Sequence, residues 1–241
     1  MRRVFTGLLD CVYPTTCFHC DSLLEGAIPM CDVCYGESAR ISDGYCKVCS
    51  EDFDGNFSEN PVCPNCHNLD FSFSFAKSAL RNTVKNRQLV ISYKYGKKHH
   101  LVRVLAKFCN EELEQNLNFT SLKHPILTPV PLHWRRKFTR GFNQAELLCK
   151  ELSRLSGLPW KMLLNRHRYT TTQTRLTRGE RLRNLGGAFS LNKRVSELSF
   201  KSIIIVDDVF TTGSTSEECA KILKKEFPKV ENIVVLTVLR G

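Results

Sequence analysis

The sequence predicts an α/β protein in two parts, a small metal-binding module followed by a domain built on a parallel β-sheet. Three observations predict this organisation. Four Cys-x-x-Cys pairs occur within the first 70 residues, uninterrupted apolar runs recur at 126–132, 203–206 and 232–239, and helical patterns separate those runs. Such alternation is typical of a parallel sheet covered on both faces. We place the boundary so that residues 1–69 hold a short amphipathic helix and the metal module, and 70–241 form the sheet domain.

Length, composition and charge limit the class of protein. The chain has 241 residues and 42% hydrophobic content, which is enough for one α/β core and a small module. No apolar run reaches membrane-spanning length, and the start of the chain lacks the pattern of a signal peptide, so we expect a soluble cytoplasmic protein. The net charge is +11, and residues 133–183 hold 13 Lys and Arg against three acids. A charge concentrated in this way favours a polyanion-binding surface over an ordinary solvated one.

The cysteine spacing predicts two structural zinc sites. A Cys-x-x-Cys turn coordinates one metal ion with two thiolates, and two such turns complete a tetrahedral site. Disulfides are the alternative, but nothing marks the chain as secreted. Sequential pairing of the turns closes the shortest loops and is therefore favoured over an interleaved cross-brace. The eight predicted ligands are Cys17, Cys20, Cys31, Cys34, Cys46, Cys49, Cys63 and Cys66.

The first half of the sheet domain is predicted to contain a strand, two helices, a second strand, a loop and a third helix. Alternating Phe71, Phe73 and Phe75 predict a half-buried strand over 70–78, and helical patterns follow at 82–95 and 101–117. The apolar strand 126–132 leads into a basic loop over 133–144 and a helix over 145–155. A basic loop between a strand and a helix suits an anion. The candidate pyrophosphate- or DNA-binding residues in it are Arg135, Arg136, Arg140, Asn143 and Gln144.

A long polar segment over 163–189 separates this loop from the next strand. Long loops in compact domains often act as lids that exclude water from a reacting centre. The candidate lid residues are Arg166, Thr172, Gln173, Arg178, Arg181 and Asn184.

The most informative stretch is IIIVDDVFTTGST at 203–215. Four β-branched residues predict a buried strand, and a loop of small hydroxyl residues around Gly213 leads into a helix over 217–227. A strand, a tight loop and a helix N-terminus together form a phosphate cradle. The paired acids Asp207 and Asp208 suit the hydroxyls of a ribose, so the expected ligand is a 5-phosphorylated ribose. Neither GxxxxGK[ST] nor GxGxxG occurs, which argues against the common nucleotide-binding loops.

These residues resemble the phosphoribosyl-pyrophosphate (PRPP) signature of type I phosphoribosyltransferases, four apolar residues, two acids, two apolar residues and Thr-Thr-Gly-x-Thr. The resemblance implies a phosphoribosyltransferase type I-like sheet domain and Mg²⁺ bound together with PRPP. It assigns the ribose to Asp207 and Asp208, which would also be the catalytic candidates. The PRPP-binding residues it implies are Asp207, Asp208, Thr211, Thr212, Gly213, Ser214 and Thr215.

Taken from end to end, the chain resembles the ComF/GntX family. The resemblance rests on the four Cys pairs, PVPL, RGFNQ, the TxxQ…R…RxxN…AF segment and VDDVFTTGST, in this order. It implies a double zinc ribbon before the phosphoribosyltransferase-like domain. It also implies handling of incoming single-stranded DNA during natural transformation, at the cytoplasmic side of the inner membrane. DNA-uptake or helicase-type competence proteins are then candidate partners besides PRPP and DNA.

Three functions stay open on the sequence alone. The first is a PRPP-binding competence protein that handles single-stranded DNA, with Trp134, Phe142 and Tyr169 as candidate stacking faces. The second is a phosphoribosyltransferase acting on an unidentified amine or nucleobase, although no segment reads as a base-recognition hood. The third is a PRPP sensor without catalysis, in which the zinc module contacts a partner protein.

Overall fold

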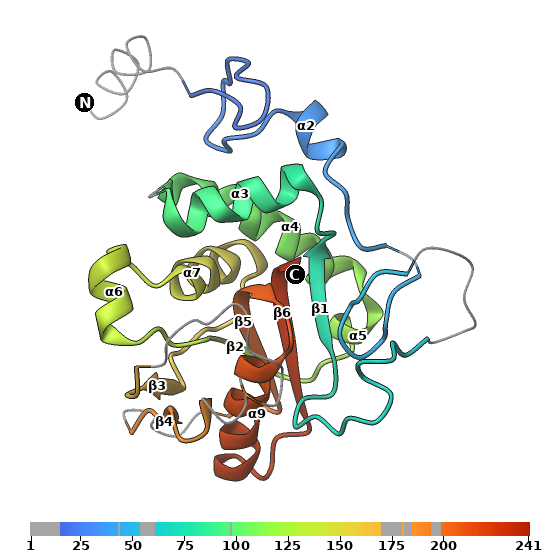
Figure 1. Cartoon of the computed structure of the whole chain (residues 1–241), viewed down its shortest axis with the longest axis vertical. Coiled ribbons are helices and arrows are strands. Elements are labelled where there is room, and N and C mark those ends of the chain that lie inside the picture. The colour runs from blue at the N-terminus through green and yellow to red at the C-terminus, as the bar shows by residue number, and fades with distance from the viewer. Residues whose placement is uncertain are drawn as a thin grey trace.

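A parallel sheet forms the centre of the molecule. The computed structural model describes residues 15–42, 44–53, 61–96, 98–169, 180, 185–193 and 199–241. Within these residues the sheet has four strands in the order β1-β6-β5-β2 (Figure 1). The strands are β1 (Ala76–Leu80), β2 (Pro125–Pro129), β5 (Ser202–Phe210) and β6 (Asn232–Arg240). The predicted parallel-sheet domain is confirmed.

The apolar run 203–206 is the buried centre of this sheet. Strand β5 pairs with β6 from Ser202 to Phe210, and every side chain of the run is at most 1% exposed. Successive side chains of a strand point to opposite faces. Ile203 and Ile205 therefore pack with helix α9 (Ser214–Glu226), whereas Ile204 and Val206 pack on the other face. A continuous apolar run is what a strand buried on both faces needs.

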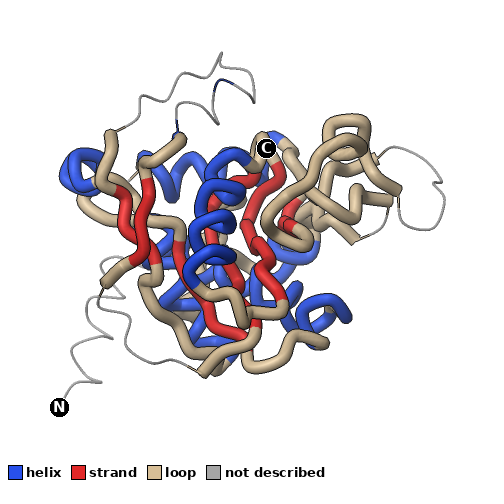
Figure 2. The backbone as a smooth tube through the Cα atoms, turned by 90° about the horizontal axis from the view of Figure 1, so that it is seen from below, coloured by secondary structure: helices blue, strands red, loops and turns tan. Residues whose placement is uncertain are grey.

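Helices cover both faces of the sheet (Figure 2). Opposite α9 lie α3 (Val84–Tyr95), α4 (Val102–Gln115) and α7 (Gln144–Ser156). A 3-10 turn (His99–Leu101) precedes α4, and the short α5 (Leu117–Thr120) follows it. The apolar face predicted for the second helix, which includes Val104, Leu105 and Phe108, is buried as expected. No described helix has the length and apolar character that crossing a membrane requires.

The cysteine-rich part of the chain covers the outer edge of β1. It is mostly loops, with one short helix, α2 (Asp32–Gly36). The main-chain amide of Ile41 donates to the Ala79 carbonyl at 3.2 Å, and the amide of Ala76 donates to the Val48 carbonyl at 2.9 Å. These bonds satisfy groups that an open edge strand would leave unpaired. The division of the chain at residues 69 and 70 stays a prediction.

Two segments differ from the sequence expectation. The predicted strand over 70–78 begins only at Ala76, and all five residues of β1 are buried, so the alternation of phenylalanines did not mark the strand. Instead, Phe71 and Phe73 pack together at 4.5 Å in an irregular segment. The predicted open loop over 133–144 contains a helix, α6 (Trp134–Arg140), which ends at Gly141 with φ +81°. His133 caps its start by accepting a hydrogen bond from the amide of Arg135.

The predicted lid is only partly within the described residues. Its two ends pair as a short antiparallel ladder of β3 (Leu164–Arg166) and β4 (Phe189–Leu191). Arg166 is therefore a strand residue. The other candidate lid residues, Thr172, Gln173, Arg178, Arg181 and Asn184, lie outside the described part of the chain.

Candidate ligand site and metal centres

The eight cysteines form two clusters of four sulfur atoms. Within each cluster the candidate ligand atoms lie within 4.8 Å of one another, and the clusters combine sequential pairs, as predicted. Four thiols at this spacing fit a tetrahedral zinc ion, and short turns supply N–H donors to the sulfurs. The clusters, named here the first and the second cysteine site, are Cys17, Cys20, Cys31 and Cys34, and Cys46, Cys49, Cys63 and Cys66.

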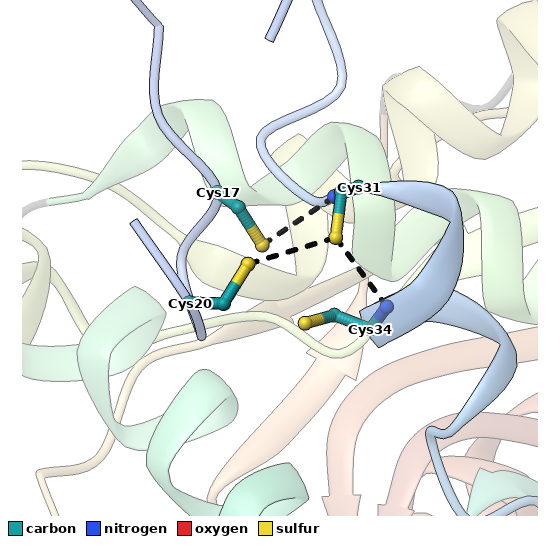
Figure 3. A group of neighbouring side chains, drawn as sticks. All are labelled: Cys17, Cys20, Cys31 and Cys34. Carbon is teal, nitrogen blue, oxygen red and sulfur yellow. Dashed lines mark hydrogen bonds between the residues drawn. The ribbon is translucent and has the colours of Figure 1, made fainter. Parts of the chain in front are cut away.

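The two sites differ in their surroundings. In the first, the amide of Cys31 donates to the Cys17 sulfur at 3.4 Å, and Cys20 is exposed to solvent (Figure 3). In the second, all four cysteines are buried, and the amide of Cys63 donates to the Cys46 sulfur at 3.3 Å. The second site also shares one apolar cluster with β5 and α9. The two structural zinc sites predicted from the spacing are supported by these donor sets.

The loop 211–215, which the sequence predicts to bind a phosphate and which is called the phosphate loop here, follows the carboxyl end of β5. Gly213 adopts φ +74° and stands at the start of α9, where no side chain from the cap position bonds the first turn. The free amide groups of that turn can therefore face an anion. A Cβ atom on Gly213 would lie 2.8 Å from the ring of Phe210, so only glycine fits without rearrangement. The hydroxyls of Thr212 and Ser214 lie 2.9 Å apart at the same loop.

The two acids are consecutive residues of β5, where Asp208 is buried and Asp207 is partly exposed. Asp208 is 5% exposed and pairs with Lys94 at 2.9 Å, and its amide donates to an Asp207 carboxylate oxygen at 2.8 Å. Burial and the neighbouring Asp208 raise the pKa of Asp207 to about 7, against the opposing effect of Lys94. Burial lowers the pKa of Lys94, but the attraction of both acids outweighs it, and the net shift is upward.

Lys94 is a residue of the candidate site that no pattern in the sequence indicated. It lies in the last turn of α3, 114 residues before its partner, and no local pattern marks it. Its position is set by Gln144, whose side-chain amide donates to the Lys94 carbonyl at 3.1 Å. The hydroxyl of Tyr93 in turn donates to the Gln144 carbonyl at 2.8 Å. These bonds fix the end of α3 over the acid pair.

The RGFNQ segment divides into buried and exposed residues. Asn143 is 6% exposed and donates to the Val130 carbonyl at 3.2 Å, and Gln144 is 2% exposed. Phe142, one of the three candidate stacking faces, instead packs inside the protein against His99, at 4.0 Å between ring centroids, and against Tyr93 at 5.7 Å. The position of Arg140 is in α6, and its side chain lies outside the described part of the structure.

Basic and aromatic side chains meet on the surface of α6. Trp134 is 64% exposed, and the guanidinium carbon of Arg135 lies 5.3 Å from its ring centroid. Arg136 lies 5.6 Å from the ring of Tyr169, which is 44% exposed. Phe138, which was not among the candidate stacking residues predicted from the sequence, is 89% exposed on the same helix. We call Trp134, Arg135, Arg136, Phe138 and Tyr169 the α6 surface.

Arg166 connects this surface electrostatically with the acid pair. Burial and the charge of Arg136 lower the pKa of Arg166 to about 10, while Asp207 acts in the opposite direction. Its guanidinium carbon lies 5.1 Å from the ring of Phe189 on the paired strand. Of the predicted lid residues, Arg166 thus interacts electrostatically with Asp207, one of the candidate ribose-binding acids.

Fold and site define the class as an α/β protein with a phosphate loop on a parallel sheet and an attached double zinc ribbon. The family model "Double zinc ribbon domain" matches residues 8–67. The chain is 31% identical to "Competence protein F" of Haemophilus influenzae, covering 87% of this chain and 90% of that protein. It is 32% identical to "DNA utilization protein YhgH" of Escherichia coli O6:H1, covering 87% and 91%. The protein belongs to the ComF family.

More distant similarities cover from about three fifths of the chain to nearly all of it. The chain is 25% identical to "Competence protein ComFC" of Bacillus subtilis, over 95% of this chain and 97% of that one. Among solved structures, it is similar to an adenine phosphoribosyltransferase, 14% identical with a TM-score of 0.38, covering 58% of this chain and 70% of that chain. The Helicobacter pylori xanthine-guanine-hypoxanthine phosphoribosyltransferase is 15% identical with a TM-score of 0.37, covering 62% and 77%.

Proposed function

We propose that the protein binds PRPP at the phosphate loop and handles single-stranded DNA during natural transformation. The observation that carries the proposal is the start of α9 at Gly213, where no side chain caps the first turn, together with the adjacent acids Asp207 and Asp208 on the preceding strand. The names of the relatives, a competence protein and a DNA utilization protein, support the biological role.

In this proposal each part of PRPP has its own partners. The 5-phosphate lies at the loop 211–215, where amides and hydroxyls donate to its oxygens. Asp207 and Asp208 accept hydrogen bonds from the ribose hydroxyls, which accounts for acids placed beside an anion site. Mg²⁺ is held mostly by the pyrophosphate oxygens of the ligand. Lys94 keeps the acid pair from repelling the phosphates by neutralising part of its charge.

The α6 surface is the proposed contact for DNA. Exposed aromatic rings offer stacking faces that tolerate any base, and arginines beside them contact the phosphates. Trp134 and Phe138 are exposed four positions apart on one helix, so both rings can meet consecutive bases. The electrostatic interactions of Arg166 with both Arg136 and Asp207 support a location of this surface near the proposed PRPP site. DNA and PRPP therefore influence each other in this proposal.

Calorimetric titration of PRPP with Mg²⁺ into the protein tests the ligand. We expect saturable binding that the double substitution Asp207→Asn/Asp208→Asn weakens at least about tenfold, because the amides donate where the carboxylates accept. Glu226→Gln, which is exposed in the last turn of α9, is the matched control and keeps the affinity. Absence of binding to the unmodified protein contradicts the proposal.

One observation favours catalysis as a second candidate function. The pKa of Asp207 near 7 is suited to a group that exchanges protons at neutral pH. A phosphoribosyltransferase would join an amine or nucleobase to C1 of PRPP and release pyrophosphate. Pyrophosphate release with a panel of amines, nucleobases and oligonucleotides tests this candidate, and no release with any acceptor removes it.

A further inference from the structure

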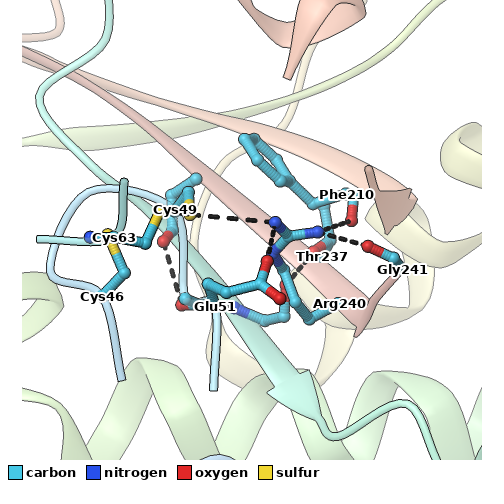
Figure 4. A network of polar contacts seen from close by, with 11 residues as sticks. Cys46, Cys49, Glu51, Cys63, Phe210, Thr237, Arg240 and Gly241 are labelled. Carbon is cyan, nitrogen blue, oxygen red and sulfur yellow. Dashed lines mark hydrogen bonds and ion pairs between the residues drawn. The ribbon is translucent and has the colours of Figure 1, made fainter. Parts of the chain in front are cut away.

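Arg240, the last residue of β6, joins the second cysteine site to the strand that carries the phosphate loop. Its guanidinium donates to the Cys49 sulfur at 3.8 Å and forms an ion pair with Glu51 (Figure 4). The same group donates to the carbonyl of Phe210 at 3.2 Å and to the carbonyl of Gly241. Arg240 is 9% exposed. One buried side chain therefore contacts both a candidate zinc ligand and the end of β5.

The contact with Phe210 reaches the phosphate loop directly. Phe210 is the last residue of β5, and Thr211 begins the loop. Its carbonyl also accepts the amide of Gly241 at 2.7 Å, and its ring fills the space that a side chain on Gly213 would need. Arg240 lies over the same ring, with 5.5 Å between the guanidinium carbon and the centroid. A shift of Phe210 would therefore displace the turn at Gly213.

The contact with Cys49 depends on what the second cysteine site holds. A zinc ion bound by four thiolates carries a net negative charge, and N–H groups donated to its sulfurs stabilise it. Without the metal the four sulfur atoms share no common partner, so the Cys49 sulfur that Arg240 contacts is no longer fixed in position. A buried guanidinium whose partner can move is itself held less firmly.

The first cysteine site packs in a different apolar cluster from the second. Cys17 belongs to the apolar cluster of α3 and α4, and Cys31 and Cys34 pack against it. The four cysteines of the second site instead share a cluster with Phe73, Phe210 and α9. The two metals are therefore expected to have different roles, although their ligand sets are the same.

We propose that Arg240 is a positioning residue that couples metal occupancy of the second cysteine site to the geometry of the phosphate loop. Zinc at this site then holds Phe210 and Gly213 in the arrangement that binds a phosphate, and zinc at the first site does not. The proposal rests on the proposed function for its ligand, but the coupling itself is a property of the ligand-free protein.

Hydrogen exchange on the full-length protein tests the coupling without any ligand. We compare unmodified protein, Arg240→Gln, the more conservative Arg240→Lys, Cys66→Ser in the second site and Cys20→Ser in the first. Cys66 is chosen because the sulfur that Arg240 contacts belongs to Cys49. We expect amides of 209–215 to exchange at least about tenfold faster in Arg240→Gln, the effect of losing roughly one charge-assisted hydrogen bond. Arg240→Lys and Cys66→Ser should share this local change, and Cys20→Ser should not.

Zinc content and PRPP titration complete the test. Arg240→Gln should keep both zinc ions and still bind PRPP about tenfold more weakly. Unchanged exchange over 209–215 in both Arg240 variants overturns the coupling, and so does equal acceleration in Cys20→Ser and Cys66→Ser. If the unmodified protein does not bind PRPP, the proposed function fails, while the exchange result still decides the coupling.

Discussion

Lys94 and Asp208 form an ion pair of 2.9 Å between the end of α3 and the strand that carries the phosphate loop. Their side chains are 22% and 7% exposed, so the pair is mostly withdrawn from water. Breaking such a pair leaves one charge without its partner in a region of low polarity, which costs more than the pair contributes when intact. The pair therefore makes the position of α3 and the charge of the candidate ribose site depend on each other.

Lys94→Met should destabilise the protein. We expect the free energy of unfolding to fall by about 3 kcal/mol, because the buried Asp208 side chain loses its cationic partner. Urea unfolding followed by circular dichroism measures this loss. Lys85→Met is the matched control, since its pair with Glu37 is 3.4 Å long and well exposed and should contribute less than about 1 kcal/mol. Equal losses in the two variants would contradict the role given to Lys94.

The raised pKa of Asp207 predicts that stability falls as the pH rises. The folded carboxyl holds its proton up to a pKa of about 7, whereas the unfolded carboxyl releases it near its ordinary value of 3.8. Between these values the folded state binds more protons, so the free energy of unfolding decreases with rising pH. Asp207→Asn should flatten this slope between pH 4 and 7 and stabilise the protein at pH 8 by on the order of 2 kcal/mol. Urea unfolding at pH 5 and pH 8 gives the slope, and an unchanged slope in the variant excludes Asp207 as its source.

Gly213→Ala should disturb the phosphate loop. The substitution combines a left-handed backbone at φ +74° with a Cβ atom 2.8 Å from Phe210. We expect a loss of about 2 kcal/mol in stability, half of it from the backbone. Gly157→Ala is the control for the backbone alone, because Gly157 has φ +73° and open space around it. Thermal unfolding should show the larger loss for Gly213→Ala, and equal losses would mean that the close approach to Phe210 is relieved at no cost.

The two cysteine sites should release zinc at different rates. Cys20 of the first site is exposed, whereas all four cysteines of the second site are buried. A chelator needs access to the ligands, so we expect one equivalent of zinc to leave quickly and one slowly. A colorimetric chelator assay follows both phases. In Cys20→Ser the fast phase should disappear, and a single rate for both ions in the unmodified protein would argue against this difference.

Substitutions on the α6 surface should weaken DNA binding without affecting stability. Trp134→Ala and Phe138→Ala remove rings that are 64% and 89% exposed, so neither leaves a cavity. Each stacked base contributes about 1–3 kcal/mol, which predicts at least fivefold weaker binding for each variant. Leu117→Ala, an exposed apolar residue on α5, is the control with no expected effect. Fluorescence anisotropy with a labelled oligonucleotide measures the affinity, and unaltered binding in both aromatic variants would remove the stacking role.

The sequence predicted the features whose signal is local. Spacing identified the eight cysteines, and loop closure favoured the sequential pairing that the structure shows. The apolar run 203–206 identified the central strand with its loop and helix. The strand expected at 70–78 begins only at Ala76. Alternating phenylalanines do not require a strand, because the rings of an irregular segment can also pack inward one by one, as Phe73 does.

Contacts between distant segments could not be predicted in this way. Lys94 meets Asp208 across 114 residues, and Arg240 meets Cys49 across 191 residues. In both cases a charged residue follows an apolar one at the end of a helix or strand, which is also the pattern of an ordinary surface residue. Asn143 and Gln144 lie in a segment that was predicted as a basic loop. Their side-chain amides instead donate hydrogen bonds to the carbonyls of Val130 and Lys94, because α7 begins inside the domain.

The most direct measurement is the anisotropy of a labelled single-stranded oligonucleotide with and without PRPP and Mg²⁺. Unmodified protein and Asp207→Asn/Asp208→Asn are compared at several salt concentrations. We predict salt-dependent DNA binding in both proteins, with an affinity that PRPP changes only when the two acids are intact. Absence of DNA binding, or the same response to PRPP in both proteins, would contradict the account.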